Sequence, residues 1–294
     1  MARALIVAAI VTVLVGWAAI GTAQTPTSPP AFRFTYRPLD VGDEAQEATH
    51  FVLDLKTVRL HDGQVVDIAD QVIERDEESH VVRLPPGSGQ SAKAKVTYQA
   101  SRQTAKGRRG VAAAESDRPV AGKTYFVARK GEDLQIVDEQ GASPPNDEHE
   151  IVARAMDGLG RKSPLGTFLN GRTVKIGDTI RLPAEFTHKM LAGWDESLAA
   201  LPLDVIFMGT QHVDGQRCAL LHTPPASTAK PGTERAPVEG KLLIEFDTCR
   251  LAVMELRGPV AATERQGQPG EEFDVRRKGK LQVAVHVEHH RAAR

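Results

Sequence analysis

Apolar and polar side chains alternate with a period of two along much of the chain between residues 31 and 291. In residues 51–60, Phe51, Leu53 and Leu55 fall on one face, whereas Asp54 and Lys56 fall on the other. Residues 93–101 and 241–247 repeat this pattern. Successive side chains of a strand point to opposite faces, so these segments predict strands with one buried face.

Turn residues interrupt the alternating runs at regular places. His61-Asp62-Gly63 and Asp214-Gly215 each separate two such runs, and Asp-Gly tolerates the positive φ angles of tight hairpin turns. Residues 130–133 and 247–250 separate two further pairs of runs. The sequence therefore predicts antiparallel hairpins.

Two stretches have helical periodicity instead. Residues 146–160 begin with Asn146 and Asp147 as candidate caps and stop at Gly158 or Gly160, which predicts a short helix. Residues between Pro183 and Pro202 predict a second helix near 184–199. Strands without βαβ alternation predict a mainly β (α+β) fold, in which an antiparallel sheet forms a half-barrel or sandwich with two short helices packed on one side.

The N-terminus predicts export. Residues 1–23 carry Arg3, an apolar run over 4–20 and small residues up to Ala23, which is typical of a signal peptide. A flexible linker at 24–30, an N-terminal antiparallel β unit at 31–139, a linker with a short helix at 140–164 and a C-terminal β unit at 165–291 follow. We expect a periplasmic or secreted protein with no stable membrane insertion after signal cleavage. The alternative is anchorage by an uncleaved N-terminal helix, because the apolar run reaches the lower length limit for a span.

Charge and aromatic content argue against two partner classes. The chain has 37 Lys and Arg against 38 Asp and Glu, whereas nucleic-acid-binding chains usually carry a basic excess. Basic clusters at 102–109 and 276–280 adjoin glycine, so we expect solvated turns there rather than anion or membrane-surface patches. Trp194 and the three tyrosines lie in or beside apolar patterns, which disfavours a carbohydrate-binding platform.

The motifs of common enzyme families are absent from the sequence. There is no G-x-S-x-G nucleophile elbow, and His149-Glu150 lacks the second histidine of a zinc-protease helix because Ala153 occupies that position. The sequence therefore predicts a non-enzymatic protein without a cofactor. Cys218 and Cys249 predict either a disulfide, since exported thiols are oxidised, or two semi-buried free thiols.

The C-terminal strand carries a histidine cluster that offers an alternative. His286, Glu288 and His290 alternate with Val285 and Val287, so the three share the polar face. Neighbouring members of the cluster could share a zinc ion, with a further ligand from His50, Asp54, His212 or His222. The competing interpretation is a polar face on an edge strand.

Large apolar residues predict a cavity between sheet and helices that suits a lipid-like ligand. The candidates for its lining are Phe51, Phe126, Phe168, Leu191 and Phe207. The same residues would equally form a closed hydrophobic core.

The runs PVAGKTYFVARKGEDLQIVDEQG, FLNGRTVKIGDTIRLP and GKLLIEFDTCRLAVMELRG share Gly and Tyr hairpin spacing. In this spacing the chain resembles an uncharacterised family of exported β-rich bacterial envelope proteins. The strand-turn units are also similar in architecture to half-barrel carriers of lipids or lipoproteins, an analogy of fold alone. Together these observations favour a non-enzymatic binding or scaffolding module for an apolar ligand or an envelope partner protein. The alternative is a zinc-dependent hydrolase that uses the C-terminal His/Glu cluster.

Overall fold

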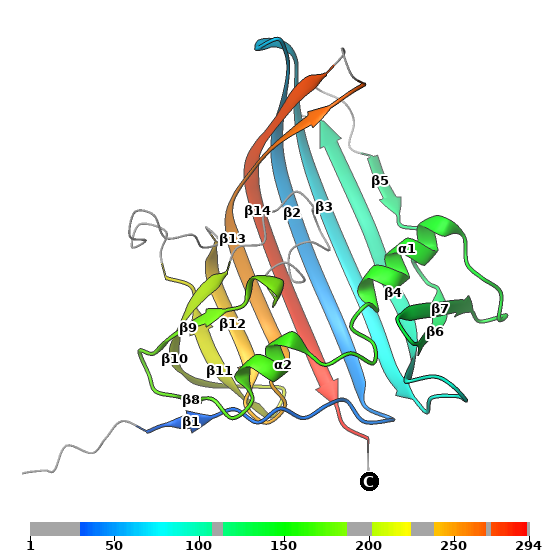
Figure 1. The fold of residues 1–294 in the computed structure, drawn as a ribbon, viewed down its shortest axis with the longest axis vertical. Coiled ribbons are helices and arrows are strands. Elements are labelled where there is room, and N and C mark those ends of the chain that lie inside the picture. The colour runs from blue at the N-terminus through cyan, green and yellow to red at the C-terminus, as the bar shows by residue number, and fades with distance from the viewer. Residues whose placement is uncertain (1–29, 108–113, 187–201, 225–237, 269–271, 293–294) are drawn as a thin grey trace, which may run out of the picture.

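Figure 1 shows the computed structural model of the chain, which describes residues 30–107, 114–186, 202–224, 238–268 and 272–292. The expected signal peptide and nearly all of the expected linker lie outside the described residues. Of the helix expected near 184–199, residues 184–186 are helical and the others are not described. No helix within the described residues is long and apolar enough to cross a membrane.

Antiparallel strands dominate the fold, as the alternating pattern predicts. The strands are β1 (Phe32–Arg33), β2 (Glu44–His61), β3 (Gln64–Leu84), β4 (Ala92–Gly107), β5 (Ala114–Asp117), β6 (Thr124–Lys130), β7 (Asp133–Asp138), β8 (Thr173–Val174), β9 (Thr179–Leu182), β10 (Leu203–Val213), β11 (Gln216–His222), β12 (Glu239–Glu245), β13 (Leu251–Gln266) and β14 (Phe273–His290). Besides the helical residues 184–186, the described residues form the helices α1 (Asn146–Ala155) and α2 (Pro164–Leu169).

One large sheet unites the two halves of the sequence. Its order is β7-β6-β4-β3-β2-β14-β13-β12-β11-β10-β9, with β5 added beside β4 and a separate β1–β8 pair. Strand β14 pairs with β2 along its whole length, from Asp274 opposite Leu60 to His290 opposite Glu44. The sheet curls strongly without closing into a barrel (Figure 1). The β units expected at 31–139 and 165–291 are therefore parts of one continuous sheet.

The two faces of the sheet have different surroundings. We call inner the face that carries Phe51 and Leu53, which pack with Leu165 and Leu169 of α2 in the larger hydrophobic core. Further along the same face, α1 covers β4, β6 and β7, where Val152 packs with its neighbours in a second core. The outer face carries the alternate side chains. Helices α1 and α2 thus lie on one side of the sheet, and α1 is the first of the two helices expected there.

Helix α1 is tied to the sheet by a buried carboxylate. Glu148 accepts hydrogen bonds of 2.6 Å from both Lys123 Nζ and the Tyr125 hydroxyl on the β6 side. These two bonds hold the pKa of Glu148 below its usual value, although burial acts in the opposite direction.

Helix α2 is not expected from the sequence pattern. Ser163 caps it by accepting a hydrogen bond of 3.0 Å from the Gly166 backbone N–H, and Pro164 occupies the first helical position. A serine cap followed by proline is a usual helix start, so Ser163-Pro164 is the local signal that identifies it.

The hairpin turns form where the sequence predicts them. Asp62 and Gly63 have φ angles of 48° and 77°, and Asp214 and Gly215 have φ angles of 48° and 75°. Positive φ at both central residues matches the right-handed twist of the paired strands.

The second basic cluster is not the solvated turn that the sequence suggests. Residues 276–280 lie within β14, paired with β2 and β13. The glycine that suggested a turn, Gly279, is needed for another reason, because a Cβ there would lie 1.8 Å from the Asp54 carbonyl oxygen. Of the first cluster, residues 102–107 belong to β4 and the others lie outside the described residues.

Candidate functional site

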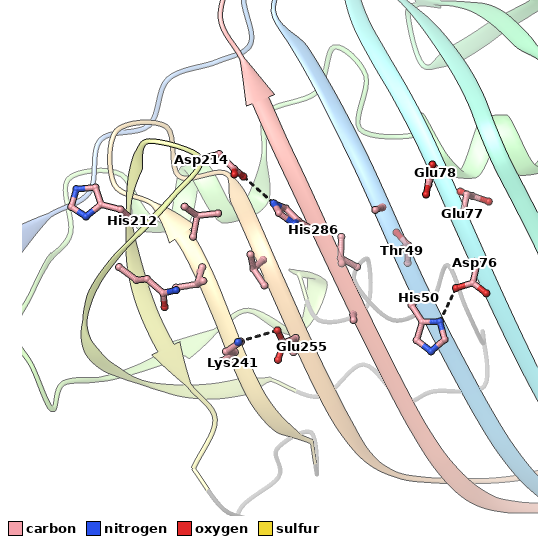
Figure 2. Close-up of a pocket in the computed structure, with 17 residues that line it drawn as sticks. Thr49, His50, Asp76, Glu77, Glu78, His212, Asp214, Lys241, Glu255 and His286 are labelled. Atoms are coloured by element: carbon pink, nitrogen blue, oxygen red, sulfur yellow. Dashed lines mark hydrogen bonds and ion pairs between the residues drawn. The ribbon is translucent and has the colours of Figure 1, made fainter.

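A groove of about 620 Å³ runs across the outer face of the sheet (Figure 2). It reaches from β3 and β2 across β14, β13 and β12 to the β10–β11 hairpin, which forms one wall. The sheet supplies its floor and the turn of the hairpin overhangs one side (Figure 2).

A bulge in β10 accompanies the curl of the hairpin. Phe207 pairs with Leu221 but Gly209 pairs with Leu220, so Met208 is an extra residue in the ladder. Gly209 has a φ of 137°, a conformation that favours glycine. Bulges increase local strand twist, which accounts for the turn of the hairpin bending toward β14. Asp214 Oδ2 there lies 2.9 Å from His286 Nε2 on β14.

The floor of the groove is partly apolar. Leu243 and Val253 line it and belong to a small hydrophobic cluster with Cys218, which lies on the outer face beneath the hairpin. Ala48 and Ala284 continue the floor toward β2. These short side chains leave room above the sheet.

Ion pairs stand around this floor. His50 Nδ1 lies 2.7 Å from Asp76 Oδ1, and Lys241 Nζ lies 2.9 Å from Glu255 Oε1. The exposed side-chain fractions are 40% for His50 and 60% for Asp76, and the His286–Asp214 pair is similarly exposed. Pairs this exposed stabilise a fold by only about 0–1 kcal/mol each. Stability alone therefore gives a weak reason for placing three of them around one groove.

One end of the groove offers ligand atoms for a metal ion. His50, Glu74 and Asp76 each place one such atom so that all three lie within 4.8 Å of one another. His50 comes from β2 and the two carboxylates come from β3, where Asp76 lies opposite His50 and Glu74 lies two residues away on the same face. One imidazole and two carboxylates suit Zn²⁺ and other divalent transition metals.

The C-terminal cluster is divided in the structure. His286, Glu288 and His290 share the outer face of β14, but they do not form a group with converging ligand atoms among the described residues. His286 pairs with Asp214, whereas His290 Nε2 lies 3.3 Å from Glu288 Oε1. Strand β14 is central in the sheet and not an edge strand. Of the further ligands considered, His50 and His212 line the groove, and Asp54 and His222 do not.

The five predicted pocket residues do not converge. Phe51 and Phe207 are buried in the larger core, and Phe168 packs against it. Phe126 follows the opposite parity from its buried neighbours Tyr125 and Val127, so it lies on the outer face, where Lys93 Nζ lies 6.0 Å from its ring centroid. Leu191 lies outside the described residues. Phe51, Phe168 and Phe207 are therefore parts of one packed hydrophobic core.

Of the two alternatives for the cysteines, the structure has the free thiols and not the disulfide. Cys218 lies in the outer-face cluster, whereas Cys249, in the turn after β12, packs into the larger core on the inner face. The sheet separates the two sulfurs. Burial raises the thiol pKa to about 12 for Cys218 and about 11 for Cys249.

Sequence patterns do not indicate that Asp76, Asp214, Lys241 and Glu255 are partners in the site. The Asp214-Gly215 sequence indicates a tight turn, but no local pattern indicates that this turn contacts His286 on β14. Lys241 and Glu255 alternate with apolar residues, and that alternation places them on the outer face.

Comparisons with known proteins leave the family open. No family model matches the chain, and no curated protein matches it. A solved structure of lipovitellin, concerned with its lipid–protein interactions, aligns with a TM-score of 0.35 and 8% identity over 87% of this chain and 26% of that chain. This chain thus spans about a quarter of the lipovitellin chain. A FadL homologue from Pseudomonas aeruginosa aligns with a TM-score of 0.21 and 10% identity over 85% of this chain and 90% of that chain. Similarities this distant carry no inference about a ligand.

Proposed function

We propose that the protein is an exported, non-enzymatic binding module of the bacterial envelope that holds an apolar or amphipathic ligand, or a segment of a partner protein, in the outer-face groove. The observation that carries this proposal is the composition of the groove, with an apolar floor between three exposed ion pairs. Such a site can bury the apolar body of a ligand while the ion pairs contact its polar groups.

The choice of the outer face follows from the packing of the inner face. Three of the phenylalanines expected to line an inner cavity, Phe51, Phe168 and Phe207, contact other core residues instead, and Phe207 packs edge to face with Phe246 at 6.1 Å between ring centroids. Non-enzymatic binding is supported by the sequence, which lacks the common catalytic motifs, and by the lining of the groove, where the described residues include three histidines but no serine or cysteine.

The test is native mass spectrometry of protein isolated from envelope fractions. Ala48→Trp should fill the groove floor, because Ala48 is exposed there, and should abolish a co-purifying mass. Ala261→Trp is the matched control, since Ala261 is also an exposed residue on the outer face but does not line the groove. Finding no bound molecule or partner on the wild type, or equal loading of both variants, contradicts the proposal.

The grouping of His50, Glu74 and Asp76 favours a second candidate function, metal-dependent hydrolysis in the same groove. A metal at these residues would activate a water molecule next to the apolar floor. Elemental analysis should then find stoichiometric zinc that His50→Ala removes and His222→Ala retains, because His222 is an exposed histidine outside the groove. Protein without metal after incubation with zinc would eliminate this candidate.

A further inference from the structure

The β2–β3 hairpin turns at the end of the sheet farthest from β1 and α2, where the β13–β14 hairpin lies beside it (Figure 1). Three apolar residues are exposed near its turn, with fractions of 57% for Val65, 53% for Val66 and 40% for Ile68. The register slips there, because Arg59 pairs with Asp67 and Leu60 pairs with Val65. Val66 is therefore outside the ladder. Hydrophobic side chains at an exposed turn are costly to leave in water unless something covers them.

A basic strip adjoins this hairpin end on the outer face. It consists of Lys56, Arg276, Lys278 and Lys280, which are all exposed and form no ion pair in the described part of the chain. Cross-strand register connects the two features, since Ile68 pairs with Val58 and Val58 pairs with Arg276. Apolar and cationic side chains thus form one continuous surface.

The strip contains an unfavourable contact. Lys56 and Lys278 are direct cross-strand partners on the same face. Like charges placed directly opposite in a sheet destabilise the pairing. Asp54 lies opposite Lys280 and Asp70 lies opposite Lys56, so two carboxylates face the four cations and the strip keeps a positive balance. A negatively charged partner would turn the repulsion into a favourable interaction.

We propose that the hairpin end and the basic strip dock the protein onto an anionic phospholipid surface. Exposed apolar side chains enter the boundary between headgroups and acyl chains, and neighbouring cations bind the anionic headgroups. A second copy of this chain fits the surface poorly, because a symmetric contact would place the basic strip against itself. This docking is peripheral, lies outside the groove, and does not depend on the ligand proposed for it.

The contribution of the basic strip to docking is tested by vesicle co-sedimentation. The full chain is mixed with vesicles of phosphatidylcholine, or of phosphatidylcholine with equimolar phosphatidylglycerol. Every variant carries the same N-terminus, so any binding by residues 1–23 is common to all. Lys56→Gln with Lys278→Gln should weaken binding to the anionic vesicles about 25-fold, at about fivefold per cation. Lys130→Gln with Lys175→Gln, two exposed lysines elsewhere, should leave it unchanged.

The contribution of the exposed apolar residues is tested with a second matched pair of double variants. Val65→Ser with Val66→Ser should weaken binding to anionic vesicles about tenfold. Val41→Ser with Ile176→Ser, with exposed fractions of 52% and 55% in the wild type, should have no effect. Circular dichroism confirms that each variant is folded. Equal binding to both vesicle types, equal binding by strip and control variants, or a dimer in solution that Val65→Ser with Val66→Ser disperses would overturn the proposal.

Discussion

The buried carboxylate of Glu148 gives a quantitative test of how α1 is attached to the sheet. Glu148→Ala removes the acceptor of the Tyr125 hydroxyl, and Tyr125 is fully buried, so its hydroxyl is left without that partner. An unsatisfied buried donor costs about 1–3 kcal/mol. Lys123 is 49% exposed, so losing its pair with Glu148 adds at most about 1 kcal/mol. We expect the free energy of unfolding to fall by about 2–3 kcal/mol.

Urea unfolding followed by far-UV circular dichroism measures this loss. Glu150→Ala is the matched control, because Glu150 lies on the same helix but is exposed, and it should change the unfolding free energy by less than about 0.5 kcal/mol. Adding Tyr125→Phe to Glu148→Ala should restore part of the loss, since no hydroxyl is then left unpaired. A Glu148→Ala variant as stable as the Glu150→Ala variant would refute the conclusion that Glu148 attaches α1 to the sheet.

The same residue predicts a pH dependence with a definite sign. Hydrogen bonds from Lys123 and Tyr125 hold the folded-state pKa of Glu148 below its usual value of 4.5. The folded protein therefore releases the proton more readily than the unfolded chain does. The stabilisation is complete above about pH 4.5 and is lost as the pH falls through the folded-state pKa. The difference in unfolding free energy between the wild type and Glu148→Gln should therefore decrease below pH 4.5.

Three further predictions concern the sheet and its cores. Gly279→Ala should destabilise the fold by about 3 kcal/mol in urea unfolding, because its Cβ would meet the Asp54 carbonyl oxygen at 1.8 Å. Gly158→Ala, with open space around its Cβ, is the control. Phe246→Ala should cost about 3–5 kcal/mol in the same assay, since Phe246 is fully buried. Cys218 and Cys249 should both be alkylated in unfolded, unreduced protein and should react slowly when folded, as mass spectrometry can show.

Each of these three has an outcome that contradicts it. A Gly279→Ala protein as stable as Gly158→Ala would mean that β14 and β2 are not paired at this register. A small effect of Phe246→Ala would place that ring at the surface. A mass lacking both alkyl groups would indicate a disulfide.

The sequence predicts much of the fold because its main signals are local. Alternation identifies the buried faces of Phe51 and Leu53, and Asp62-Gly63 and Asp214-Gly215 identify two hairpins whose positive φ angles the structure confirms. The basic segment around Lys278 was assigned to a turn because its glycine suggested one. There the glycine instead permits close approach of neighbouring backbones within a strand.

The candidate site could not be predicted because it depends on register. Counting back from the Asp62-Gly63 turn without a bulge places Arg75 opposite His50. The irregularity at Arg59 and Leu60 shifts the pairing by one residue, so Asp76 is the partner. A one-residue slip sends every side chain to the other face. The contact of Asp214 with His286 likewise depends on a hairpin that bends over the two intervening strands, β12 and β13, which no local pattern encodes.

The position of β14 between β2 and β13 has a consequence for biogenesis. During synthesis β2 emerges long before β14, its permanent neighbour on one side, because residues 62–272 separate the two strands. Until then the long ladder of β2 keeps an open row of amide and carbonyl groups, a template for intermolecular aggregation. We therefore expect a nascent chain of this topology to be prone to aggregation until β14 is made. Truncation before residue 273 would remove β14 and leave two half-sheets in which β2 and β13 are unpaired edge strands.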